Sequence, residues 1–189
     1  MNYATIKSRD VANGTGVRVS VFVSGCTHHC PDCFNREAWD FDYGEKFTDA
    51  TIDEIIKLAQ PDYISGLSLL GGEPFEMQNQ EGLLPLLQKF VDTYPKKDVW
   101  CYTGYLFEDI LSGKVGEKQT AVDMLNHIDI LVDGRFEKQL KNLNLKFKGS
   151  ENQRIIDVKQ SLKLQKIVLW DGDLENLTKN KVLKNVDKC

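Results

Sequence analysis

The sequence predicts an α/β protein whose mostly parallel sheet forms a partial, incomplete βα barrel. Short apolar runs of strand length alternate with segments of helical period, which is the pattern of βα units. At least four of the predicted strands end in a polar or glycine-rich turn, where βα folds carry their chemistry. The chain has 189 residues, fewer than the ~200 that a complete eight-unit barrel requires.

The predicted strands are short runs rich in β-branched, aromatic or other apolar residues. They are 18–24, 66–70, 98–102, 128–132, 153–158 and 166–170. The first of them ends at a cysteine-rich loop. The next three end at Gly71-Gly72, Thr103-Gly104 and Asp133-Gly134. Since the strands are expected to be parallel, these turns should meet at one edge of the sheet.

Helices are predicted between the strands, at about 51–60, 84–94 and 107–126. Thr51 and Glu54 have the spacing of a capping box at the start of the first helix, and Pro61 ends it. Pro85 is expected in the first turn of the second helix, where a missing backbone N–H costs little. The third helical region has no sharp boundaries in the sequence.

Composition points to a single domain, residues 1–189, with an ordinary core: 41% of the residues are apolar. A net charge of −4 argues against a nucleic-acid partner. The N-terminal residues lack the apolar region of a signal peptide. No apolar run reaches the ~20 residues that span a membrane, so a cytoplasmic location is expected. The lysine-rich tail, about 178–189, is predicted to be a solvated end, with docking to an acidic partner as the alternative.

Three cysteines lie close together, Cys26, Cys30 and Cys33, in the spacing C-x3-C-x2-C. The chain has five cysteines, an odd number, and their crowding indicates metal chemistry rather than a disulfide framework. Three thiolates suit a [4Fe–4S] cluster in which one iron lacks a protein ligand, and an open position is typical of catalytic metal sites. Cys101 is predicted to be a buried apolar residue and Cys189 a terminal thiol.

A structural zinc site is the alternative for the cysteine loop, residues 26–33. Such sites usually show two C-x2-C pairs, or one pair with distant histidines. His28 and His29 lie between the first two cysteines, and so tight a loop does not easily bring either onto the same metal. We expect both histidines to be loop residues, because a histidine on the iron would close its open position.

Taken together, the three cysteines and the Gly-Gly-Glu-Pro turn after a later strand resemble the radical S-adenosylmethionine (SAM) superfamily. Further segments resemble the branch that activates anaerobic ribonucleotide reductases: NGTGVRVSVFVSGC, CPDCFN, LLGGEP, WCYTGY, ILVDGRF and FKGSENQR, spread from Asn13 to Arg154. One position departs from the superfamily pattern, which often has an aromatic residue before the third cysteine. Here Asp32 precedes Cys33 and Phe34 follows it, an arrangement that resembles the activating branch.

The resemblance implies a [4Fe–4S] cluster on the three cysteines and SAM on the fourth iron. Gly71 and Gly72 would let the backbone approach SAM closely, and Glu73 would accept a hydrogen bond from the SAM ammonium group. Other cofactor contacts implied or considered are Asp32, Cys33, Phe34, Thr103, Tyr105 and Asp133. Ser150, Asn152 and Gln153 belong to a family segment without an assigned role. Arg18 is either near the anionic cluster or a surface residue of an edge strand.

The resemblance also implies the reaction. A flavodoxin- or ferredoxin-type donor reduces the cluster, SAM is cleaved, and the 5′-deoxyadenosyl radical generates a glycyl radical on the anaerobic ribonucleotide reductase. Two alternatives remain within the superfamily: an activase of another glycyl-radical enzyme, of the pyruvate formate-lyase type, or a short enzyme acting on a small molecule. A non-catalytic zinc or iron–sulfur binding module is the alternative outside it.

Overall fold

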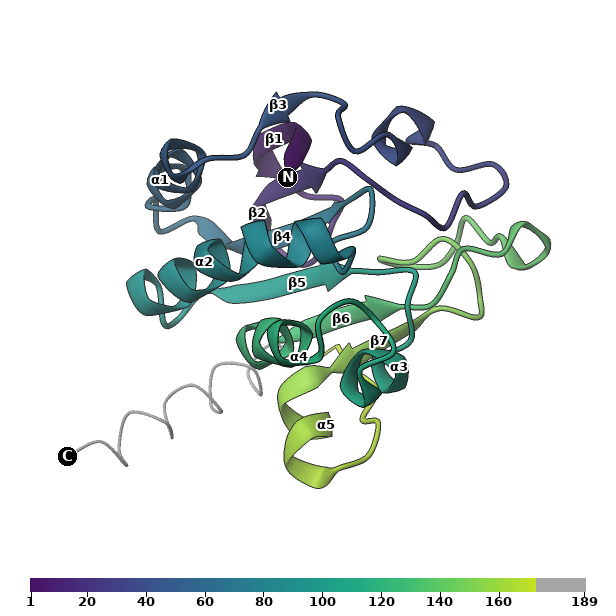
Figure 1. The fold of residues 1–189 in the computed structure, drawn as a ribbon. Coiled ribbons are helices and arrows are strands. Elements are labelled where there is room, and N and C mark those ends of the chain that lie inside the picture. Colours follow the sequence, from purple (N-terminus) through teal and green to yellow (C-terminus); the bar gives the residue numbers. More distant parts are fainter. Residues whose placement is uncertain (173–189) are drawn as a thin grey trace.

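Seven strands form one sheet, in the order β3-β1-β2-β4-β5-β6-β7, in the computed structural model, which describes residues 1–172 (Figure 1). The strands are β1 (Asn2–Asp10), β2 (Val17–Val23), β3 (Glu45–Lys46), β4 (Ile64–Gly71), β5 (Asp98–Tyr102), β6 (Ile130–Asp133) and β7 (Arg154–Asp157). The central strands β2, β4, β5 and β6 pair in parallel, and the outer strands are antiparallel. The mixed α/β fold with its mostly parallel sheet is therefore confirmed. The sheet is open, and the partial barrel stays a prediction.

The helices lie in the connections between strands, as predicted. They are α1 (Asp49–Leu58), α2 (Met77–Thr93), α3 (Phe107–Ser112), α4 (Lys118–His127) and α5 (Val158–Leu164), with 3-10 turns η1 (Arg36–Trp39) and η2 (Lys138–Leu140). The predicted helical region 107–126 is two helices, because Gly113 ends α3 in the left-handed conformation, at φ 80°.

Two details of the predicted helices were wrong. The capping box of α1 joins Thr48 and Thr51, not Thr51 and Glu54, so the helix starts earlier. Pro85 lies well inside α2 rather than in its first turn. This helix begins with a polar stretch at Met77 that carries no apolar stripe, and its start was therefore invisible to periodicity.

The strand predictions failed at both ends of the chain. Strand β1, which lies between the short edge strand β3 and β2, was not predicted, because six of its nine residues are polar or charged and no apolar alternation marks it. Predicted strand 166–170 is only an isolated bridge between Leu169 and Ile156. The strand before it stops at Asp157, whose side chain accepts a hydrogen bond from Gln160 N and caps α5. The predicted tail 178–189, with Cys189, lies outside the described residues.

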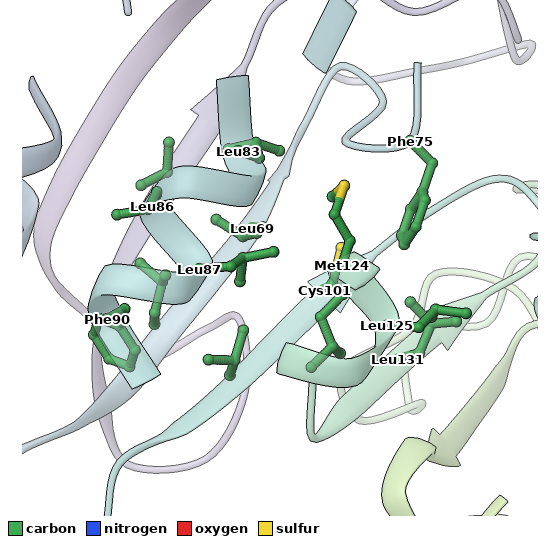
Figure 2. Close-up of a cluster of buried hydrophobic side chains, with 14 of the residues drawn as sticks. Leu69, Phe75, Leu83, Leu86, Leu87, Phe90, Cys101, Met124, Leu125 and Leu131 are labelled. Carbon is green, nitrogen blue, oxygen red and sulfur yellow. The ribbon is translucent and has the colours of Figure 1, made fainter. Parts of the chain in front are cut away.

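The main core lies between the sheet and the helices α2 and α4 (Figure 2). Strand residues Leu69, Cys101 and Leu131 face the helical side chains Leu83, Leu86, Leu87, Phe90, Met124 and Leu125. All nine are fully buried, which confirms the prediction for Cys101. Among the described residues, none of the helices has the length and apolarity needed to cross a membrane.

Arg18 is fully buried on the opposite face of the sheet, so neither of its two expected positions is correct. Its guanidinium group donates to Ser68 Oγ at 2.7 Å and to Leu67 O at 2.9 Å, and pairs with Asp98 at 2.5 Å. It also lies 5.6 Å from the ring centre of Trp100. Arg18 of β2 therefore joins its strand to the neighbouring parallel strands β4 and β5.

We expect Arg18→Met to destabilise the protein by about 3 kcal/mol, because it breaks a buried ion pair and leaves buried acceptors without a donor. Urea unfolding measures the loss. Arg9→Met is the matched control, since Arg9 is exposed, stacks on Tyr63 and donates from Nε to the Tyr63 hydroxyl at 3.2 Å, all at the surface; it should change stability by less than about 1 kcal/mol. Equal effects of the two variants would contradict a structural role for Arg18.

Candidate cofactor site at the ends of the parallel strands

A cavity of about 530 Å³ opens at the carboxyl ends of β2, β4, β5 and β6. The predicted site residues that line it are Cys26, Cys30, Asp32, Cys33, Phe34, Gly71, Gly72, Glu73 and Thr103. They come from segments far apart in the sequence, as the pattern of strand ends predicted. Asp133 is not among the lining residues. It is buried and accepts from Phe107 N and from Arg154 Nε, both at 2.9 Å, and its cofactor role has no support in this geometry.

The cysteine loop is a compact turn that follows β2. His29 and Asp32 have left-handed backbone angles, φ 47° and 58°, a conformation that occurs mostly in tight turns. Cys33 N donates to Cys30 O at 3.1 Å. Asn35 N donates to the Cys33 sulfur at 3.4 Å, a contact that stabilises a thiolate. All three cysteines are unpaired thiols facing one cavity.

Burial sets the protonation of the deepest of these thiols. Desolvation raises the pKa of Cys26 to about 12, and the negative charge of Glu73 contributes to the same shift. The free thiol therefore keeps its proton at neutral pH, and the thiolate forms only when a cation binds the sulfur.

The start of α2 holds the cysteine loop in place. Glu76 accepts from Thr27 N at 2.9 Å and from Thr27 Oγ1 at 2.6 Å. The Asn79 amide donates to Ser24 O and to Glu73 O, both at 2.9 Å. Sequence reasoning missed Glu76 and Asn79. The available signal was their place just after the Gly-Gly-Glu-Pro turn, where polar residues stand in a helix that packs against the core.

Glu73 is the most highly connected side chain of the site and is only 1% exposed. Its carboxylate accepts from Phe75 N (2.9 Å), Thr103 Oγ1 (2.7 Å), Gly104 N (2.7 Å) and His28 Nε2 (3.0 Å). The last donor lies on the cysteine loop, and its ring packs against Tyr105 at 4.4 Å. Glu73 thus links the ends of β4 and β5 to the cysteine loop.

Gly71 and Gly72 are required by close contact between chain segments. A Cβ on Gly71, which has φ 112°, would lie 2.7 Å from Phe22 Cα and from Val23 N. A Cβ on Gly72 would lie 2.5 Å from Gly25 O. The two glycines also line the cavity, but the contacts that exclude a side chain are with β2 and with Gly25, the residue just before the cysteine loop.

Gly72→Ala should therefore destabilise the protein by about 2 kcal/mol, because backbone atoms cannot move aside cheaply. Gly82→Ala is the control, since the Cβ there meets only the flexible end of Met1 and alanine favours a helix by ~1 kcal/mol. Urea unfolding of both variants provides the measurement. A Gly72 variant as stable as the wild type would show that the turn can relax.

The residues flanking Cys33 lie at the mouth of the cavity. Asp32 pairs with Lys138 Nζ at 2.8 Å, and this hydrogen bond lowers the pKa of the Asp32 carboxyl. Phe34 is 89% exposed. Both positions are open to solvent as well as to the cavity.

Comparison with known proteins decides the family. A model of the 4Fe-4S single cluster domain matches residues 12–156, which include the cysteine loop and the other strand ends of the site. The anaerobic ribonucleoside-triphosphate reductase-activating protein of Enterobacteria phage T4 is 41% identical over 82% of this chain and 93% of its own length. The chain belongs to this family of activating proteins. The Escherichia coli K12 relative of the same name is 39% identical over 81% of this chain and 96% of its own length.

The three thiols of the cysteine loop are compatible with the 4Fe-4S cluster that the matched family model describes. Among residues 1–172, no group of three or more His, Cys, Asp or Glu side chains is arranged to hold one ion. In a cubane each ligand sulfur binds its own iron, so the sulfurs need not converge on one point. Three thiols from one loop, facing one cavity, are compatible with this requirement.

Proposed function

We propose that the protein, residues 1–189 as a single radical SAM domain, is an oxidoreductase that generates a glycyl radical on the anaerobic ribonucleotide reductase. Cys26, Cys30 and Cys33 would hold a [4Fe–4S] cluster, with SAM on the iron that lacks a protein ligand. When bound and reduced, this pair supplies a 5′-deoxyadenosyl radical that takes a hydrogen atom from a glycine α-carbon of the reductase. The observation that carries the proposal is one cavity lined by the three thiols and by Glu73.

The chain's own residues would hold and orient the cofactors. The Cys26 thiol loses its proton on binding iron, and Asn35 N donates to the Cys33 sulfur. Glu73 is the proposed contact for the SAM ammonium group. Its backbone donors are fixed parts of the strand ends, whereas His28 belongs to the cysteine loop. We therefore infer that a bound ammonium group replaces the His28 hydrogen bond.

The other proposed SAM contacts are judged by whether they line the cavity. Five of them do and stay candidates for binding SAM: Asp32, Phe34, Thr103, Gly71 and Gly72.

Electrons would come from a flavodoxin- or ferredoxin-type donor, and the cytoplasm is the proposed location. An activase of a pyruvate formate-lyase-type enzyme stays the second candidate, although the relatives' names favour the reductase.

The test is anaerobic incubation of the cluster-loaded protein with the reductase, SAM and a chemical reductant, followed by electron paramagnetic resonance. The expected result is a glycyl radical on the reductase and release of 5′-deoxyadenosine. Release of 5′-deoxyadenosine without a radical on the reductase, but with one on a pyruvate formate-lyase-type partner, would favour the second candidate. No cleavage of SAM at all would reject the radical mechanism.

A further inference from the structure

The β6–β7 loop, residues 134–153, is far longer than the two to five residues that usually join antiparallel neighbours. It nevertheless has fixed hydrogen bonds at its base. Gln153 Oε1 accepts from Gly149 N at 2.8 Å and from Ser150 N at 3.1 Å, and Gln153 Nε2 donates to Gly134 O at 2.9 Å. The family segment around Ser150 and Gln153 therefore has a structural role: it holds this loop in one shape.

The loop is also anchored to the sheet and to the cysteine loop. The Phe147 ring packs edge-on against Trp100 at 5.1 Å, on the face away from the main core. Lys138 pairs with Asp32 of the cysteine loop. The two loops lie on the same side of the molecule, at the right in Figure 1, and both line the cavity. Together they form its mouth.

Two large apolar side chains at this mouth are exposed to solvent. Leu143 of the β6–β7 loop is 88% exposed and Phe34, just after the cysteine loop, is 89% exposed. Both line the cavity. Exposed apolar side chains beside a concave site, on a loop that is held in shape, are typical of contacts made with a partner.

The β6–β7 loop is basic although the chain is acidic. Its five basic residues are Arg135, Lys138, Lys141, Lys146 and Lys148, and its two acidic residues are Glu137 and Glu151. The loop therefore carries +3, and because the whole chain carries −4, the remainder carries −7. All of the basic side chains are exposed except that of Lys148, which is half-buried. Such a local reversal of sign attracts an acidic surface and orients it at the mouth.

We propose that the β6–β7 loop, with Phe34, is the surface that docks the protein substrate, and that it binds an apolar segment flanked by acidic residues. This inference rests on the proposed function, in which the partner is the reductase. A protein substrate must bring its reacting carbon into the cavity, and the loop lines that cavity. An electron donor needs only to come near the cluster, so the same position is not required of it.

The experiment measures the affinity of the cluster-loaded, full-length protein for the reductase, anaerobically and at several salt concentrations. Leu143→Ser should weaken binding at least tenfold, the loss of one buried leucine contact. Lys141→Glu/Lys146→Glu should also weaken binding and should flatten its salt dependence. Leu164→Ser and Lys96→Glu are matched controls on distant exposed positions and should bind like the wild type. Iron content and urea unfolding of each variant show that it is folded and loaded.

Affinities of the Leu143 and lysine variants within twofold of the wild type would overturn the inference. So would variants that bind the reductase normally but accept electrons more slowly from reduced flavodoxin, because the loop would then be a donor site. The proposed function fails differently: the wild-type protein itself would bind the reductase and produce no glycyl radical.

Discussion

Cys30→Ala is expected to abolish cluster binding. The wild-type protein, reconstituted anaerobically, should bind about four irons per chain, and the variant less than one, because two protein thiolates bind a cubane cluster too weakly to retain it. Glycyl-radical formation should be lost with the iron. Iron and sulfide analysis, with the optical spectrum of the cluster, provides the measurement.

Cys101→Ala is the matched control, since it removes a sulfur from the core rather than from the cavity. It should keep the full iron content and cost about 1 kcal/mol of stability. A Cys30 variant with unchanged iron would show that the cysteine loop is not the ligand set. One zinc per wild-type chain, without iron or sulfide, would reject the cluster itself.

Glu73→Gln should impair both SAM binding and folding. The amide removes the negative charge that the proposed ammonium contact requires, worth about 2–3 kcal/mol for a hydrogen bond to a charged group, or roughly 30- to 140-fold in affinity. Its NH₂ group would also face donors that now point at a carboxylate, and stability should fall by about 2 kcal/mol. Anaerobic equilibrium dialysis with labelled SAM and urea unfolding measure the two effects.

Glu81→Gln removes the same charge from an exposed position of α2 and should change neither quantity. A Glu73 variant that binds SAM within threefold of the wild type, yet unfolds more easily, would limit Glu73 to holding the strand ends together. Equal stability with weaker SAM binding would instead leave Glu73 a pure ligand contact.

The sequence was most informative where one residue type suits one task. Cysteine spacing and strand-end turns predicted which segments meet, because parallel strands deliver their ends to one edge. Periodicity could not find β1 or the start of α2, where polar residues fill regular structure. It also could not place Arg18, because a charged residue in a strand is ordinarily exposed and here five polar contacts and a tryptophan ring surround it.

The connections of Glu73 and the role of the β6–β7 loop were beyond sequence reasoning for a different reason. They depend on contacts between residues up to about a hundred positions apart, such as the Arg135 guanidinium donating to His28 O. No local pattern encodes such a pair, whereas the fold determines it once the strands are ordered.

The tryptophans of the described residues provide two separate optical signals. Trp39 stacks on His29 of the cysteine loop at 4.6 Å. Trp100 and Trp170 lie edge-on at 5.0 Å, and Phe147 of the β6–β7 loop covers Trp100. Emission from Trp39 should report on filling of the cofactor site. Emission from Trp100 and Trp170 should report on movement of the β6–β7 loop. Single-tryptophan variants would thus allow the order of cofactor and partner arrival to be followed without any added dye.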